Sequence, residues 1–117
     1  MHAAGTRLAL GGYSMRTGAG EVRVLDLETG REVVPPLKGH SGSASSLAFS
    51  PDGQRLATSG VDATVRLWDL VTGQETMTWR GLWLELEFVA GGRRLMGVSP
   101  DGTVRTWDTT PVPEKTK

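Results

Sequence analysis

The pattern that most constrains the fold is a short motif that returns along the chain at intervals of about 40 residues. The copies read VRVLD, VRLWD and VRTWD, and they end at Asp26, Asp69 and Asp108. An Arg-Leu pair precedes each copy, beginning at Arg7, Arg55 and Arg94. Repeats of this length are typical of small structural units that stack and bury a core between neighbours. The chain therefore contains three related units.

The central unit, Gly39 to Asp69, has the pattern of short strands joined by tight turns. Runs rich in apolar and β-branched residues alternate with turn residues about every ten positions. In the Ser-Pro-Asp-Gly turn, Pro51 presets its own φ, and Gly53 can adopt the positive φ that closes the turn. No helical period fits this segment. The sequence predicts an antiparallel β-meander and an all-β fold.

The central unit resembles a WD-repeat blade of a β-propeller, because Gly39-His40 opens it and Trp68-Asp69 closes its third strand. The resemblance implies a structural hydrogen-bond network that joins His40, Asp62 and Trp68. The family's fourth member, a Ser or Thr, is expected two residues before the Asp, where this chain has Gly60. We therefore expect the network to be incomplete.

The outer units depart further from the pattern that the family implies. The third unit offers Ser99, Asp101 and Trp107 for a corresponding network, but it lacks the Gly-His pair. The first unit has Leu25 in place of the Trp and Ala19 in place of the turn Asp. The family resemblance thus implies a partial β-propeller with one complete four-stranded blade between two incomplete ones.

The expected boundaries follow from counting strands, named a to d from the propeller centre outward. Residues 1–36 should hold strands b, c and d, with no room for strand a before Arg7, and residues 37–80 all four. Residues 81–109 should hold a, b and c, and residues 110–117 form a polar tail with two prolines. Because an N-terminal strand usually completes the last blade in this family, we expect the C-terminal piece of a larger propeller.

Composition limits the classes of partner. Thirteen basic and thirteen acidic residues balance, which gives no electrostatic reason to expect binding to nucleic acid or an anionic membrane. The chain has no cysteine, and none of its apolar runs approaches the ~18 residues that a membrane span needs. Its N-terminus lacks the basic segment followed by an apolar segment that is typical of a secretory signal. We expect a cytoplasmic protein without a metal or a cofactor.

The residues that could perform chemistry are better explained as structural ones. His40 could act as a base, but the family position makes it a bracing residue. The repeated aspartates Asp26, Asp69 and Asp108 lie on separate units, so they cannot form an acid–base pair. The prediction is a non-enzymatic protein-interaction module. Two alternatives remain: a structural unit whose copies associate through open blade edges, and a part of a propeller enzyme.

The best candidate for binding a protein or peptide partner is an insertion of about five residues between strands b and c of the first unit. It contains Tyr13, Met15 and Arg16. In propellers, loops of this kind share a face with the d–a connections, and that face most often grips peptides. An exposed loop without a binding role explains the same residues equally well.

Overall fold

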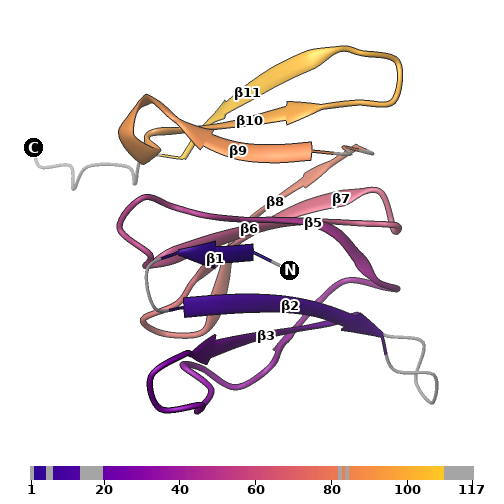
Figure 1. Cartoon of the computed structure of the whole chain (residues 1–117). Coiled ribbons are helices and arrows are strands. Elements are labelled where there is room, and N and C mark those ends of the chain that lie inside the picture. Colours follow the sequence, from indigo (N-terminus) through magenta and orange to yellow (C-terminus); the bar gives the residue numbers. More distant parts are fainter. Residues whose placement is uncertain (1, 5–6, 14–19, 82, 84, 110–117) are drawn as a thin grey trace, which may run out of the picture.

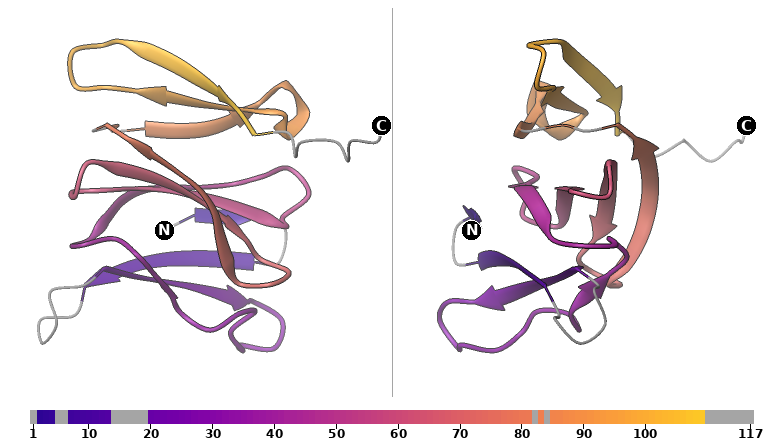
Figure 2. Two further views of the ribbon diagram at one scale, coloured as in Figure 1. Left: turned by 180° about the vertical axis from the view of Figure 1, so that it is seen from behind. Right: turned by 90° about the vertical axis from the view of Figure 1, so that its right-hand side faces the viewer.

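The structure, a computed structural model, describes residues 2–4, 7–13, 20–81, 83 and 85–109; for residues 2–4 and 13 it describes the backbone alone. Three antiparallel sheets lie one above another (Figure 1). The side view in Figure 2 shows them as successive twisted layers. Within the described residues the helical structure is one short 3₁₀ turn, η1 (Ala90–Gly92), and no helix there is long and apolar enough to span a membrane.

Within each sheet, strands that follow one another in the chain are neighbours. The first sheet consists of β1 (His2–Ala4), β2 (Arg7–Tyr13), β3 (Gly20–Asp26) and β4 (Leu37–Lys38). The central sheet consists of β5 (Ala44–Phe49), β6 (Arg55–Gly60), β7 (Thr64–Asp69) and β8 (Gln74–Arg80). The third sheet consists of β9 (Glu85–Val89), β10 (Arg94–Val98) and β11 (Val104–Asp108).

The pairing register confirms that the sequence repeat is a structural repeat. In every sheet the Arg of the Arg-Leu pair lies opposite the Asp that ends the motif, in the pairs Arg7–Asp26, Arg55–Asp69 and Arg94–Asp108. The next pair inward brings a Leu opposite Leu25, Trp68 or Trp107. Equivalent positions in the three sheets can therefore be compared residue by residue.

The expectation that no strand fits before Arg7 is wrong. The three residues of β1 pair antiparallel with β2, in the register His2–Ala9, Ala3–Leu8 and Ala4–Arg7. Because backbone pairing needs no particular side chains, a strand this short leaves no readable alternation in the sequence. The first sheet therefore has an inner strand.

The outer strand of the first sheet also differs from the expected span of residues 31–36. That segment follows β3 with a single bridge, between Leu25 and Glu32, and the paired strand β4 comes later, at Leu37–Lys38. Pro35 and Pro36 lie between the two contacts. Since proline has no N–H to donate, the ladder is interrupted there.

Apolar side chains fill the two spaces between the sheets, because successive residues of a strand point to opposite faces. One cluster joins the first and central sheets: Ala9, Val22, Val24, Val34, Leu37, Phe49, Leu56, Trp68 and Leu70. The other joins the central and third sheets: Ala48, Ala57, Val65, Leu67, Trp83, Leu86, Phe88, Leu95 and Trp107. The central sheet is thus covered on both faces.

Candidate functional site

A chain of buried polar side chains crosses the central sheet. The indole Nε1 of Trp68 donates to Thr58 Oγ1 over 3.0 Å, and Thr58 Oγ1 lies 2.6 Å from His40 Nε2. The other imidazole nitrogen, Nδ1, lies 3.0 Å from Asp62 Oδ1. His40 and Thr58 are fully or almost fully buried. Four side chains from separate segments are therefore joined in one network.

Donor and acceptor chemistry fixes the direction of these hydrogen bonds. A carboxylate can only accept, so His40 Nδ1 carries the proton and donates to Asp62. Nε2 of the neutral ring then accepts from the Thr58 hydroxyl, whose oxygen in turn accepts from Trp68. Every donor has an acceptor in this arrangement, as buried polar groups require.

Further donors hold Asp62 in place. Ser41 N–H donates to Oδ2 over 2.9 Å, and the Thr64 hydroxyl donates to Oδ1 over 2.9 Å. Burial by itself would raise the pKa of Asp62, but the bonds from Ser41, His40 and Thr64 outweigh it and lower the pKa below its usual value. Asp62 is thus an ionised acceptor that ties the β6–β7 turn to the segment before β5.

The predicted gap in the network at Gly60 is wrong. The hydroxyl comes from Thr58, two residues earlier on the same face of β6, where it lies between the imidazole and the indole. A Cβ at Gly60 would lie 2.4 Å from His40 Nδ1 and 2.6 Å from Asp62 Oδ1. The contact between these two side chains occupies that space, so the network itself requires glycine there.

The structure does not bring Ser99, Asp101 and Trp107 into a corresponding network. Ser99 and Asp101 lie in the turn between β10 and β11, where the Ser99 hydroxyl and the Thr103 N–H donate to the carboxylate. These bonds, Ser99 first, lower the pKa of Asp101 to about 2. Gly97 stands in the third sheet where Thr58 stands in the central one, so no hydroxyl is available to Trp107 at that position.

Trp107 is held by aromatic contacts instead. Its ring stacks on Trp79 with centroids 5.3 Å apart and meets Trp83 edge-on at 5.1 Å. A Cβ at Gly97 would lie 3.0 Å from the Trp107 ring, so the ring covers that glycine. Trp79 and Trp83, which bound the connection from the central to the third sheet, are therefore packing residues.

Within the described residues, no group of three or more His, Asp or Glu side chains is placed to hold a metal ion. The aspartates of the turns act locally. For example, the Ser50 hydroxyl and the Gln54 N–H lower the pKa of Asp52. Asp26 and Asp69 accept from the backbone N–H two residues ahead, at Glu28 and Val71.

The predicted partner-binding residues are Tyr13, Met15 and Arg16. Met15 and Arg16 lie outside the described residues, and Tyr13 is described only as the last backbone position of β2, opposite Gly20. Their role stays a prediction.

The structure adds a shallow pocket at the end of the central sheet where β6 turns into β7. Its lining includes Ser41, Asp62, Thr64, Arg66 and Arg80. Arg66 donates to Glu75 over 2.8 Å, whereas Arg80 is exposed and has no ion-pair partner among the described residues. Sequence reasoning missed this pocket because Arg80 and Ser41 are far apart in the chain.

The comparisons with known proteins agree with this geometry. The family model described as "WD domain, G-beta repeat" matches residues 31–69. Human WD repeat-containing protein 36 is 44% identical over 52 residues, which are 44% of this chain and 6% of that protein. Protein groucho of Drosophila melanogaster is 45% identical over 56 residues, 48% of this chain and 8% of that protein. The guanine nucleotide-binding protein subunit beta of Oryza sativa subsp. indica is 41% identical over 54 residues, 46% of this chain and 14% of that protein.

A solved structure extends the likeness to the whole fold. The β-propeller domain of Cps50 (Swd1) from Myceliophteria thermophila aligns with 96% of this chain and 38% of that one, with a TM-score of 0.68 at 22% identity. The chain spans 14% or less of the three curated relatives. The expected fold, a partial all-β propeller, is confirmed. Residues 31–69 are therefore similar to a WD repeat, and the chain as a whole has the fold of a partial β-propeller.

Proposed function

We propose that the chain is a non-enzymatic protein-interaction module built on the WD-repeat propeller fold. The observation that carries this is the state of the buried polar groups: both ring nitrogens of His40 and both carboxylate oxygens of Asp62 are engaged by protein atoms. Because the hydrogen bonds of these polar groups hold turns in place, they stabilise a rigid surface. We also propose a cytoplasmic location and a protein or peptide partner. The supports are the balanced charge of the chain and its similarity to WD-repeat proteins.

We place the partner surface at the end of the stack that carries the β6–β7 turn. Val61 in this turn is 61% exposed, and the pocket with Arg66 and Arg80 lies beside it. An exposed apolar side chain next to a cation is a common composition for a protein contact. The insertion after Tyr13 joins β2 to β3 in the same way as this turn joins β6 to β7.

Affinity capture with the full chain tests the proposal, with a matched pair of exposed valines. Val61→Asp changes the proposed surface, whereas Val71→Asp makes the same change at the opposite end of β7, where Val71 is 70% exposed. We expect a protein captured by the wild type to be lost with Val61→Asp and Arg80→Glu and kept with Val71→Asp. Equal capture by all variants would refute this surface.

The insertion is tested separately with Tyr13→Ala and Arg16→Ala. We expect each change to weaken the same interaction severalfold, because aromatic and Arg side chains dominate binding energies. Unchanged binding in both variants would show that the insertion has no role, and would leave the surface around Val61 as the one to consider.

A further inference from the structure

Arginine side chains join successive sheets of the stack. Arg7, the first residue of β2, donates from Nη1 to the carbonyl oxygen of Gly53 in the central sheet's β5–β6 turn, over 2.7 Å. Arg55, the first residue of β6, donates from Nη2 to Gly92 O over 2.6 Å and from Nη1 to Thr109 O over 2.7 Å. Each contact runs from one sheet to the next in chain order.

The contacts of Arg7 with Gly53 and of Arg55 with Gly92 are equivalent in both donor and acceptor. Arg7 and Arg55 occupy the same register position, opposite the Asp that ends the next strand. Their acceptors Gly53 and Gly92 lie in the turns that lead into β6 and β10, and both have positive φ, 73° and 94°. A backbone carbonyl held in such a turn is a fixed acceptor for a guanidinium.

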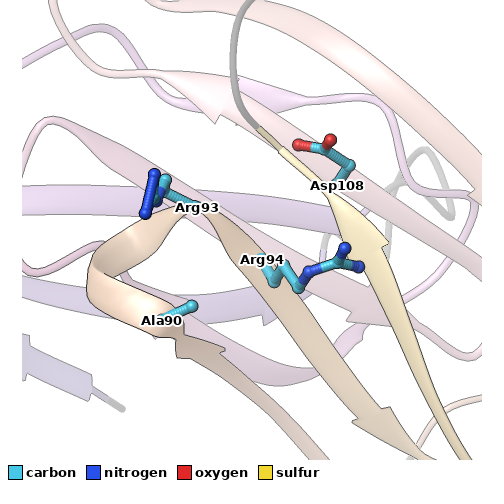
Figure 3. A pocket seen from close by; sticks show the side chains of 4 residues that line it. All are labelled: Ala90, Arg93, Arg94 and Asp108. Carbon is cyan, nitrogen blue, oxygen red and sulfur yellow. The ribbon is translucent and has the colours of Figure 1, made fainter.

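Arg94 is the third arginine of this series. It begins β10 and lies opposite Asp108. Leu95 points into the core shared with the central sheet, so Arg94 projects from the other face. It is exposed, and its guanidinium makes no hydrogen bond or ion pair within the described residues. Figure 3 shows it beside Asp108 in a pocket that Ala90 and Arg93 complete.

We call the face of a sheet that meets the next sheet its leading face, and the opposite face its trailing face. The leading face of the third sheet carries partly buried Met96 and Val98 beside Arg94, together with Val104, which is 58% exposed. The trailing face of the first sheet carries Leu8, Leu25 and Leu10, which is 36% exposed. Neither face is covered in the described part of the chain.

We propose that the leading face of the third sheet docks on the trailing face of the first sheet of a second copy, with Arg94 donating to a backbone carbonyl of that copy. The same contact is made twice between the sheets of the chain, by Arg7 and by Arg55. The third sheet offers a leading face for another such contact, and the first sheet offers a trailing face. Such head-to-tail contacts are heterologous and can close into a ring. Two copies would supply about six sheets, within the roughly four to eight of known propellers.

The contact should be weaker and more sensitive to salt than those inside the chain. Glu87 on β9 occupies the position that the buried Ala48 holds on β5, and it is exposed on the leading face. Bringing this carboxylate toward a second copy costs desolvation, whereas Arg94 contributes a charge-assisted hydrogen bond. We expect reversible association whose strength changes with ionic strength.

Sedimentation equilibrium of the full chain over a range of concentrations tests the proposal. We expect the wild type to form dimers reversibly, and Arg94→Ala to weaken dimerisation about tenfold or more, since a hydrogen bond to a charged group contributes ~1.5–3 kcal/mol. Arg105→Ala is the control, because this exposed residue of β11 lies on the other face of the same sheet, above Trp107. A wild type that stays monomeric at the highest concentration would overturn the proposal, and so would equal effects of the two variants.

Mixing two variants tests the head-to-tail geometry. Leu10→Glu damages the trailing face, and Arg94→Ala damages the leading face. In a sample of either variant alone, every contact between two copies therefore includes one damaged face. In a mixture, the intact leading face of the first can dock on the intact trailing face of the second. We expect the mixture to associate more strongly than either variant alone. Association no stronger than in the separate samples would contradict docking between these two faces.

Discussion

The central and third sheets share strand register but hold their tryptophans by different means. Trp68 donates to Thr58, which a buried imidazole and carboxylate hold in turn. Trp107, at the equivalent position, lies over Gly97 among two other indoles. The difference shows that the polar network is not what forms a sheet of this fold. It fixes one turn against one neighbouring segment, and aromatic packing can secure the same strand without it.

Thr58→Val removes the hydroxyl at the middle of the network while keeping the side chain's shape. The Trp68 N–H and His40 Nε2 would both lose their buried partner, at about 1–3 kcal/mol each. We expect the free energy of unfolding, measured by urea denaturation, to fall by about 3 kcal/mol. Thr106→Val on the exposed face of β11 is the control and should change little. Equal values for both variants would mean that the network contributes no stability.

Gly60→Ser introduces a hydroxyl at the position where the family resemblance predicts one. The structure has no room for a side chain at this position. The new Cβ would lie within 2.6 Å of polar atoms of His40 and Asp62, so we expect a loss of about 2 kcal/mol. The matched change Ser99→Gly, at the equivalent position of the third sheet, should cost well under half of that. A stabilised Gly60→Ser protein would show that our assignment of Thr58 is wrong.

Replacing each tryptophan with phenylalanine compares the two modes of packing directly. Trp68→Phe loses ring area and also leaves Thr58 without its donor, whereas Trp107 makes no hydrogen bond within the described residues. We expect Trp68→Phe to cost about 1 kcal/mol more than Trp107→Phe in thermal or urea unfolding. A larger loss at Trp107 would show that aromatic stacking is the stronger of the two anchors.

Acid should weaken the central network by a small amount. The pKa of Asp62 is lowered in the folded chain, so the unfolded chain takes up its proton at a higher pH. The stabilisation is complete above the unfolded value of about 4, and it is lost as the pH falls through the lower folded value. Asp62→Asn should therefore flatten the dependence of unfolding free energy on pH below about 4. An unchanged slope would contradict the ionised state of Asp62.

Much of this structure is readable from the sequence, because alternation and turn residues report the strands directly. The runs around Arg55–Gly60 and Thr64–Asp69 are strands, and the Arg-Asp register follows from the repeat. The hydroxyl was expected at position 60 because the family pattern was counted back two residues from Asp62. Strand periodicity places Thr58 and Leu56 on one face, and Leu56 pairs with Trp68, so a count in steps of two would have found the hydroxyl.

Other features depend on how sheets stack, which no local pattern records. The bonds from Arg7 and Arg55 join residues more than thirty positions apart, and they exist only because adjacent sheets bring a glycine turn within reach. The strand β1 is too short for periodicity to reveal. The pocket beside Arg80 likewise gathers residues from three separate turns and strands.

Native-state hydrogen exchange on the wild type and on Thr58→Val tests the central claim most directly, namely that the central sheet is buried on both faces and is secured further by this network. We predict that the slowest amides lie within residues 44–69, the part of the central sheet that has a neighbour on both faces. We also predict that Thr58→Val speeds their exchange to that of the third sheet. Slowest amides in the third sheet, or unchanged protection in the variant, would contradict the account.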